Sequence, residues 1–216
     1  MRKFLIAFAF LIAGCTLPSQ APPPAAPAAE PRSSAPFEAW TVTQSRLEVR
    51  VFRAGTMEKL GHNHLITSDA LTGTVELREP RTASGFRFEL PIESLRVDDP
   101  EARKAAGPEF GREVPEKDRE ATRANMLGES VLDAKRQAVL ILTADGLSGG
   151  PEQFELKLRV ALRGEERVVA VPVSVRFEAS KLEVRAHFSL RHADLGLTPF
   201  TAALGALRVR DDIGID

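Results

Sequence analysis

The chain contains a single cysteine among 216 residues, so no disulfide can form within it. Its formal net charge is −1, and it has no basic cluster with interleaved aromatic residues, which argues against nucleic-acid binding. The sequence also lacks a nucleophile elbow, a glycine-rich phosphate loop and an HExxH motif. Since the common signatures of hydrolases, nucleotide-binding proteins and metalloproteases are missing, we expect a protein that is not an enzyme.

The first fifteen residues, MRKFLIAFAFLIAGC, have the pattern of a targeting segment. Two basic residues precede an apolar core, residues 4–13, that is too short to span a bilayer. Its end, IAGC, resembles the lipobox of bacterial lipoproteins. The resemblance implies that residues 1–14 are a signal peptide and that the Cys15 thiol carries an acyl chain such as palmitate. Thr16, where an aspartate would favour inner-membrane retention, favours the periplasmic face of the outer membrane.

The segment that follows the cysteine is rich in proline and alanine. Residues 16–36 read TLPSQAPPPAAPAAEPRSSAP, a composition that favours extended polyproline II over a packed structure. We therefore expect residues 15–36 to be the lipidated cysteine and its tether. Residues 37–216 then make one folded domain, long enough for a substantial core.

Apolar and polar residues alternate through most of this domain, which predicts strands with one buried face. In FELKLRVAL, apolar residues recur at every second position from Phe154 to Leu162. The predicted strands are RLEVRVF (46–52), ALTGTVEL (70–77), GFRFEL (85–90), FELKLRVAL (154–162), RVVAVPVSVRF (167–177), LEVRAHF (182–188) and ALRVRDDIGI (206–215).

The connections between these segments predict an antiparallel arrangement. Residues 163–166 and 178–181 are hairpin-sized turns, and Pro172 predicts a strand edge or a bulge. Residues 116–133 contain strong helix formers with Gly128 as a stop, and the charged residues 97–115 before them predict a surface excursion. The pattern allows two packed sheets or a barrel, and the long hairpins favour the barrel. We therefore predict a mainly all-β fold, an eight-stranded antiparallel lipocalin-like barrel with one helical insertion.

At this point the order of the segments resembles the YceI-like family of periplasmic, lipocalin-like proteins. The resemblance runs from Trp40-Thr41-Val42 through Gly73-Thr74-Val75 to the closing LRHADLGL (190–197). Between them, REATRANMLGESVLDAKRQAVLILTA and LKLRVALRGEERVVAVPVSV resemble the family's helix and its paired strands. One departure is Lys135-Arg136-Gln137, which stands where a Tyr-Pro-like pair is usual. The resemblance implies a barrel that binds a polyisoprenoid or another long lipid.

An apolar barrel interior suits such a ligand, because a chain without hydrogen-bonding groups needs only apolar walls. The ligand would be a polyisoprenoid, an isoprenoid quinone or a fatty acyl lipid. The alternative is that the same side chains merely fill the barrel as its core. The predicted lining residues are Phe86, Phe88, Phe154, Leu156, Leu158, Val173, Phe177, Val184 and Phe188.

The four histidines leave two further possibilities open. In LGHNH, extended chain would place His62 and His64 about 6.5 to 7 Å apart on one face, although Gly61 before them suggests a turn that separates them. We predict that His62, His64, Arg191 and His192 form a polar rim that recognises the head group of the ligand. The alternative is a zinc, copper or haem site built from His62, His64, His187 and His192.

Three acidic residues in a proline-bounded loop, Glu93, Asp98 and Asp99, are interpreted as solvated carboxylates, as are Asp211, Asp212 and Asp216 near the end of the chain. The remaining possibility for function is an envelope module that docks a partner on its outer face and holds no ligand. The strand edge that Pro172 predicts would also allow a homodimer.

Overall fold

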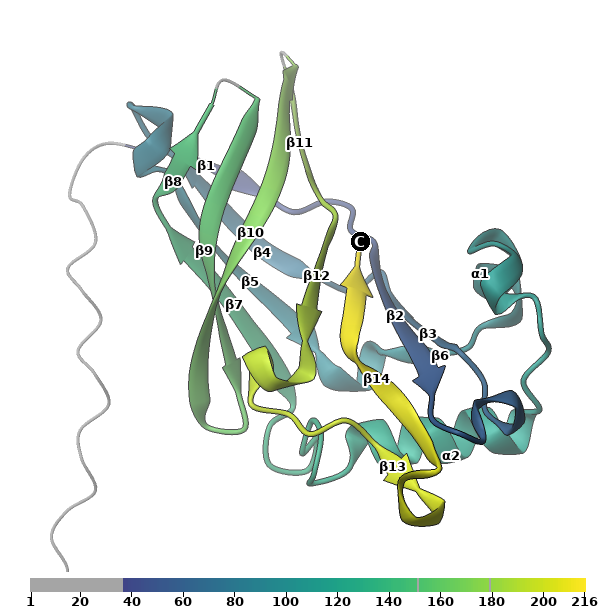
Figure 1. The fold of residues 1–216 in the computed structure, drawn as a ribbon. Coiled ribbons are helices and arrows are strands. Elements are labelled where there is room, and N and C mark those ends of the chain that lie inside the picture. Colours follow the sequence, from purple (N-terminus) through teal and green to yellow (C-terminus); the bar gives the residue numbers. More distant parts are fainter. Residues whose placement is uncertain (1–36, 151, 179) are drawn as a thin grey trace, which may run out of the picture. The chain divides into compact units, whose positions relative to one another are not determined.

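The computed structural model describes residues 37–150, 152–178 and 180–216, and Cys15 and the predicted tether lie outside these residues. The strands form two antiparallel sheets (Figure 1). One has the order β1-β4-β5-β7-β9-β10-β11 with β8 beside β9, and the other has the order β12-β14-β2-β3-β6 with β13 beside β14. The strands are β1 (Glu38–Thr41), β2 (Leu47–Ala54), β3 (His64–Ser68), β4 (Thr72–Leu77), β5 (Gly85–Pro91), β6 (Arg96–Val97), β7 (Val139–Asp145), β8 (Leu147–Gly149), β9 (Gln153–Leu162), β10 (Glu165–Glu178), β11 (Lys181–Ala186), β12 (Phe188–Arg191), β13 (Thr201–Ala202) and β14 (Leu207–Ile215).

The two sheets join into one barrel because several strands bend from one sheet into the other. β1 continues into β2, β3 into β4, β5 into β6, and β11 into β12. β14 pairs with both β12 and β2, so the ladders return to where they began. With each bent pair counted once, the barrel has eight strands, the other four being β7, β9, β10 and β14. The predicted eight-stranded antiparallel barrel is therefore confirmed.

The predicted strands and turns agree with the structure, and the reason is local. The turn between β9 and β10 uses Arg163 and Gly164, both with positive φ, as a two-residue hairpin turn requires. In LEVRAHF the predicted strand is interrupted at His187, where β11 ends and β12 begins. Pro172 lies just beyond the last pair of the β10–β11 ladder, Val173 with Ala186. Pro172 therefore lies where β10 has no β11 partner, although β10 itself is an inner strand between β9 and β11.

The predicted surface excursion before the helix is wrong. Residues 97–115 instead contain α1 (Pro100–Ala105) and a short 3-10 helix, η4 (Pro108–Phe110), and the Phe110 side chain is only 1% exposed. Phe110 lies against Phe52 of β2 with a ring-centroid distance of 5.8 Å. A buried aromatic side chain stabilises the fold through its area, so this segment is a packed layer outside the barrel wall.

The helical insertion between β6 and β7 therefore contains two α-helices and one 3-10 helix. α2 (Glu116–Leu127) ends at Gly128, as predicted, and runs along the lower end of the barrel (Figure 1). Met126 and Leu127 from its last turn pack against the lower apolar cluster. No described helix is long and apolar enough to cross a membrane.

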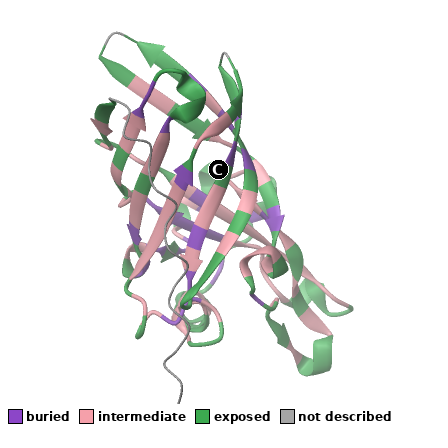
Figure 2. Ribbon diagram, turned by 90° about the vertical axis from the view of Figure 1, so that its left-hand side faces the viewer, coloured by how far each residue is buried: buried purple, intermediate pink, exposed green. Residues whose placement is uncertain are grey.

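Two apolar clusters occupy different parts of the barrel. The lower cluster includes Leu90, Ile92 and Leu162 and is covered by α2. The upper cluster includes Ala144, Phe154 and Val171 from β7, β9 and β10. Buried and exposed residues alternate along parts of β9 and β10, the pattern that a wall with one apolar face produces (burial is coloured in Figure 2).

Candidate functional site

Most of the predicted lining residues lie on the inner face of the sheet that contains β5, β7, β9, β10 and β11. Phe88 stacks on Phe86 with a centroid distance of 4.2 Å, and both project from β5. The predicted residues that belong to the upper cluster are the buried Phe154, Leu156 and Val173 and the partly buried Phe86, Leu158 and Phe188. The structure therefore places these side chains in one apolar wall, and their role in binding stays a prediction.

Two other predicted lining residues lie on the same face but remain exposed. Val184 of β11 pairs with the buried Val175, and Phe177 at the end of β10 pairs with Leu182. Because directly paired residues project to one face of a sheet, both side chains belong to the inner wall. Val184 is nevertheless 46% exposed and Phe177 is 42% exposed. The apolar inner wall is therefore accessible to solvent along β11.

Two arginines of the connection from β4 to β5 lie over aromatic rings near this accessible wall. The Arg81 guanidinium is 5.0 Å from the centre of the Phe177 ring, and the Arg78 guanidinium is 4.7 Å from that of Phe37. Cation–π contacts of this kind stabilise an exposed ring without burying it. The connection therefore links the end of β10 with the residue before β1.

Among the predicted rim residues, His64 contacts a buried carboxylate. It begins β3, and its Nδ1–H donates a hydrogen bond of 2.6 Å to Oδ2 of Asp98. The other carboxylate oxygen of Asp98 accepts from the Leu65 N–H at 2.8 Å and from Arg103 of α1 at 2.5 Å. Asp98 is 0% exposed, so its interpretation as a solvated carboxylate is wrong. The histidine ring is fixed by a buried carboxylate, as in many oriented histidines.

The electrostatics of this group follow from its contacts. Burial alone would raise the pKa of Asp98, but the hydrogen bonds from His64, Leu65 and Arg103 outweigh it and hold the pKa below its ordinary value. His62 lies beside His64, with ring centroids 6.3 Å apart, close to the predicted separation. Burial, and then the neighbouring Arg112 and His64, lower the pKa of His62, so its neutral form is favoured at pH 7.

The other acidic residues of the same loop and of the chain end have ordinary partners. Asp99 caps α1 by accepting from the Ala102 N–H at 2.9 Å, and the exposed Glu93 pairs with Arg123 at 2.7 Å. Asp212 pairs with Arg210 at 2.7 Å. These side chains satisfy local hydrogen bonds, which is a structural role.

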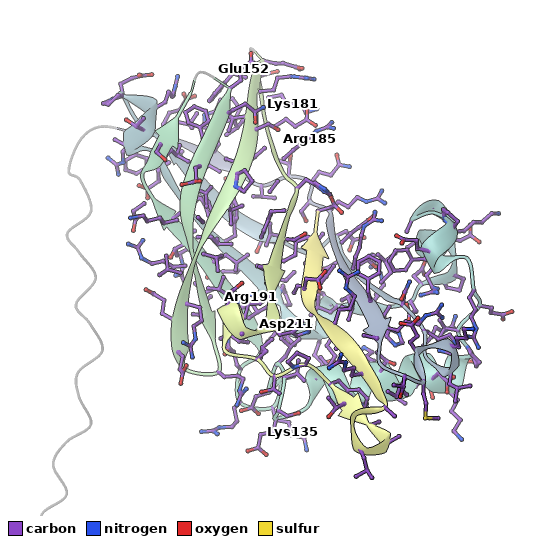
Figure 3. All side chains as sticks on the ribbon, viewed as in Figure 1. Lys135, Glu152, Lys181, Arg185, Arg191 and Asp211 are labelled. Atoms are coloured by element: carbon purple, nitrogen blue, oxygen red, sulfur yellow. The ribbon has the colours of Figure 1, made fainter. Side chains whose placement is uncertain are left out.

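The other two rim candidates, Arg191 and His192, and the metal-site candidate His187 lie elsewhere. His187 pairs with Asp216, whereas Nδ1 of His192 bonds to the Asp211 carbonyl at 2.8 Å. Arg191 pairs with Asp194 of η5 (His192–Leu195) at 2.8 Å. Figure 3 shows Arg191 and Asp211 together in the lower half of the barrel, away from Glu152, Lys181 and Arg185 at its upper end. The predicted rim is therefore two separate groups.

The alternative metal or haem site was predicted where the four histidines could meet, and the structure keeps His187 and His192 away from the His62–His64 pair. His192 contacts Asp211 and His187 contacts Asp216, which is five residues further along the chain. At the rise of an extended chain, these two partners are roughly 16 Å apart. His64 lies on β3, which β2 separates from β14. Among the described residues, no group of three or more His, Cys, Asp or Glu side chains could hold a metal ion. The four-histidine site therefore has no geometric basis.

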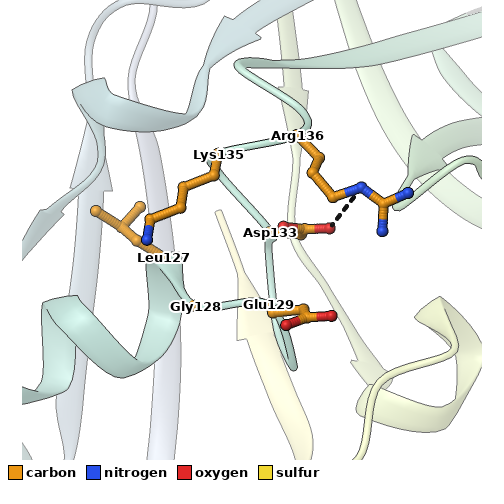
Figure 4. A pocket seen from close by; sticks show the side chains of 6 residues that line it. All are labelled: Leu127, Gly128, Glu129, Asp133, Lys135 and Arg136. Atoms are coloured by element: carbon orange, nitrogen blue, oxygen red, sulfur yellow. Dashed lines mark ion pairs between the residues drawn. The ribbon is translucent and has the colours of Figure 1, made fainter.

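A pocket at the end of α2 lies outside the apolar wall (Figure 4). It is lined by Leu127, Gly128, Glu129, Asp133, Lys135 and Arg136. Asp133 and Arg136 form an ion pair of 3.8 Å across it. Lys135 and Arg136 belong to the segment where the sequence departs from the YceI-like pattern. A lining with four charged side chains does not suit an apolar chain.

Comparisons with known proteins confirm the architecture. No family model and no curated protein matches the sequence. The crystal structure of BcnA from Burkholderia cenocepacia superimposes with a TM-score of 0.52 at 11% identity, covering 78% of this chain and 92% of that one. A polyisoprenoid binding domain from Saccharophagus degradans gives 0.48 at 14% identity, covering 79% and 90%, and the Campylobacter jejuni YceI protein gives 0.45 at 10%, covering 67% and 75%.

The chain has a YceI-like fold. This confirms the lipocalin-like architecture that the resemblance of the sequence implied. At these identities the likeness concerns the fold alone, since unrelated functions often share an architecture. The function of this YceI-like barrel must therefore be argued from its own accessible inner wall.

Proposed function

We propose that the protein is a lipid-anchored carrier of the cell envelope, which binds one long apolar or amphiphilic molecule against the inner wall of its barrel. The ligand class is a polyisoprenoid, including an isoprenoid quinone, or an acyl lipid. The protein binds this molecule and does not transform it. Ligands without polar groups along their length need an apolar surface rather than a set of hydrogen bonds, and this wall supplies such a surface.

The observation that supports this proposal is the exposure of Val184 and Phe177 on the inner face. A barrel whose interior is only its own core would bury side chains that project inward, as it buries Val175 beside Val184. Covering the exposed inner side chains with a ligand removes apolar area from water, which favours binding by about 25 cal/mol for each Å² covered. The accessible wall therefore fits a removable apolar occupant.

The proposed ligand is tested by extracting the protein after mild purification from its native envelope. We expect mass spectrometry of the organic extract to detect an isoprenoid or acyl lipid at close to one molecule per protein. The matched control is Val184→Asp purified in the same way, which should yield much less of the same lipid. Equal, trace amounts of mixed lipid from both proteins would instead favour a docking module without a ligand.

The proposed anchor has a separate test. Cys15→Ser removes the thiol that would be acylated. We expect the variant either to leave the membrane fraction for the soluble fraction or to migrate as a larger precursor that keeps its signal peptide. Two or more acyl chains hold a protein on a bilayer durably, so the change should be nearly complete. Immunoblotting of fractionated cells measures it, with Thr16→Ser as the control. Wild-type protein found mainly in the soluble fraction would contradict the anchor but leave the ligand proposal intact.

A further inference from the structure

Trp40 carries a hydrogen-bond donor on the inner apolar wall. It lies on β1 and pairs with Val75 of β4, which in turn pairs with Phe86 of β5. Directly paired residues project to the same face, so Trp40 shares the face of Phe86, which packs against the upper apolar cluster. Trp40 therefore belongs to the proposed binding wall, a role that the sequence pattern did not suggest.

The indole N–H of Trp40 is buried and has no hydrogen-bond partner among the residues that the structure describes. Such a donor is unfavourable, because it has lost water without gaining an acceptor. The other side-chain atom in this condition is Nε of Arg167, but that guanidinium already pairs with Glu165. Trp40 is thus the donor whose missing acceptor is unexplained within the described part of the chain.

We propose that Nε1 of Trp40 donates a hydrogen bond to a single uncharged oxygen, such as a carbonyl, on the otherwise apolar ligand. This inference rests on the proposed function and adds the polar contact that orients the chain in the barrel. Apolar sites usually fix their ligands through a few polar groups of this kind. The bond would satisfy the donor only when the ligand is present.

The surroundings favour an uncharged oxygen over a phosphate or carboxylate. Across the sheet, a row of directly paired residues runs from Trp40 to Val75, Phe86 and Ala144. None of these three side chains can donate a hydrogen bond. Burying a charged group requires several donors or a counter-ion, whereas one indole N–H satisfies one neutral acceptor. A ligand with a neutral oxygen in an isoprenoid chain fits this wall best.

Two commercially obtainable molecules isolate this contact. Pristane is a saturated isoprenoid hydrocarbon, and phytone has nearly the same skeleton with a carbonyl oxygen in place of one methyl branch. Because a hydrogen bond to a buried donor contributes roughly one factor of ten, we expect the wild-type protein to bind phytone about tenfold tighter than pristane. Trp40 is the only tryptophan and the chain has no tyrosine, so its fluorescence reports each titration directly.

Trp40→Phe keeps an aromatic ring but removes the donor, and we expect it to lose the preference for phytone, because the buried carbonyl oxygen then has no donor. Displacement of a naphthylamine probe measures this variant, which lacks intrinsic tryptophan fluorescence. Phe86→Leu is the matched control, since it changes the same wall without touching a donor and should weaken both ligands by the same factor. Benzothienylalanine at position 40, which has the shape of tryptophan but no N–H, separates the lost donor from altered packing.

The outcomes distinguish this inference from the proposed function. A phytone preference that persists in both the phenylalanine and the benzothienylalanine variants would overturn the role of Trp40, as would equal binding of the two ligands by wild type. In either case measurable binding would still support an apolar carrier. Wild-type protein that binds neither molecule nor the probe would remove the proposed function itself, and the inference with it.

Discussion

Val184→Asp is expected to weaken the binding of long apolar ligands by roughly a hundredfold. The Val184 side chain lies on the inner wall, and a ligand that covers it would also cover the new carboxylate. Removing a charge from water without a partner costs several kcal/mol. A hundredfold loss of affinity corresponds to about 2.7 kcal/mol, which lies within this cost. Aspartate is preferred to lysine because its short side chain cannot reach past the ligand into solvent.

Val168→Asp is the matched control for this experiment. Val168 is on the same pair of strands, is 56% exposed, and projects from the opposite face of β10 because it alternates with Val169 and Val171. We expect its ligand affinity to stay within about twofold of wild type. Displacement of a naphthylamine probe from both variants gives the comparison. Equal losses in both variants, or none in either, would contradict a binding site on the inner wall.

Asp98→Ala is expected to lower the free energy of unfolding by about 3 to 5 kcal/mol. The substitution leaves Arg103, itself buried, without its carboxylate, and removes the acceptor of the His64 ring and of the Leu65 N–H. Urea unfolding followed by circular dichroism measures the change. Asp69→Ala is the control, because Asp69 pairs with Arg96 on the exposed surface and its loss should change stability little.

The same carboxylate gives the stability a defined dependence on pH. The pKa of Asp98 is held below its value of about 3.9 in unfolded chains, so ionised Asp98 stabilises the fold above that pH. This contribution is lost as the pH falls through the lower, folded pKa. We expect the stability difference between wild type and Asp98→Asn to be largest near pH 7 and to shrink below about pH 4. A difference that is the same at both pH values would contradict this role.

Much of the fold follows from local sequence. Alternation in FELKLRVAL and RVVAVPVSVRF predicted β9 and β10, and the two-residue turn between them matches Arg163-Gly164. Gly128 marked the end of α2 because glycine is, after proline, the residue least favourable inside a helix. These signals depend on neighbours in the chain, so they can be read without the tertiary structure.

The candidate site could be predicted only in part. The face that carries Phe86, Phe154 and Val173 followed from the period of two along a strand. The roles of Asp98 and Trp40 could not be predicted from this period. Asp98 was interpreted as solvated because its partner His64 is 34 residues away, and Trp40 became a candidate only through its unpartnered donor on the wall.

By itself, the sequence determined that the domain is built from alternating strands and which face of each strand is apolar, and it favoured a barrel over two packed sheets. Only the tertiary structure decided that part of this face stays exposed at Val184, and that His187 and His192 lie apart from the neighbouring His62 and His64. The physical reason is range. Periodicity records how each residue alternates with its neighbours, whereas exposure and pairing depend on strands that meet only after the chain has closed on itself.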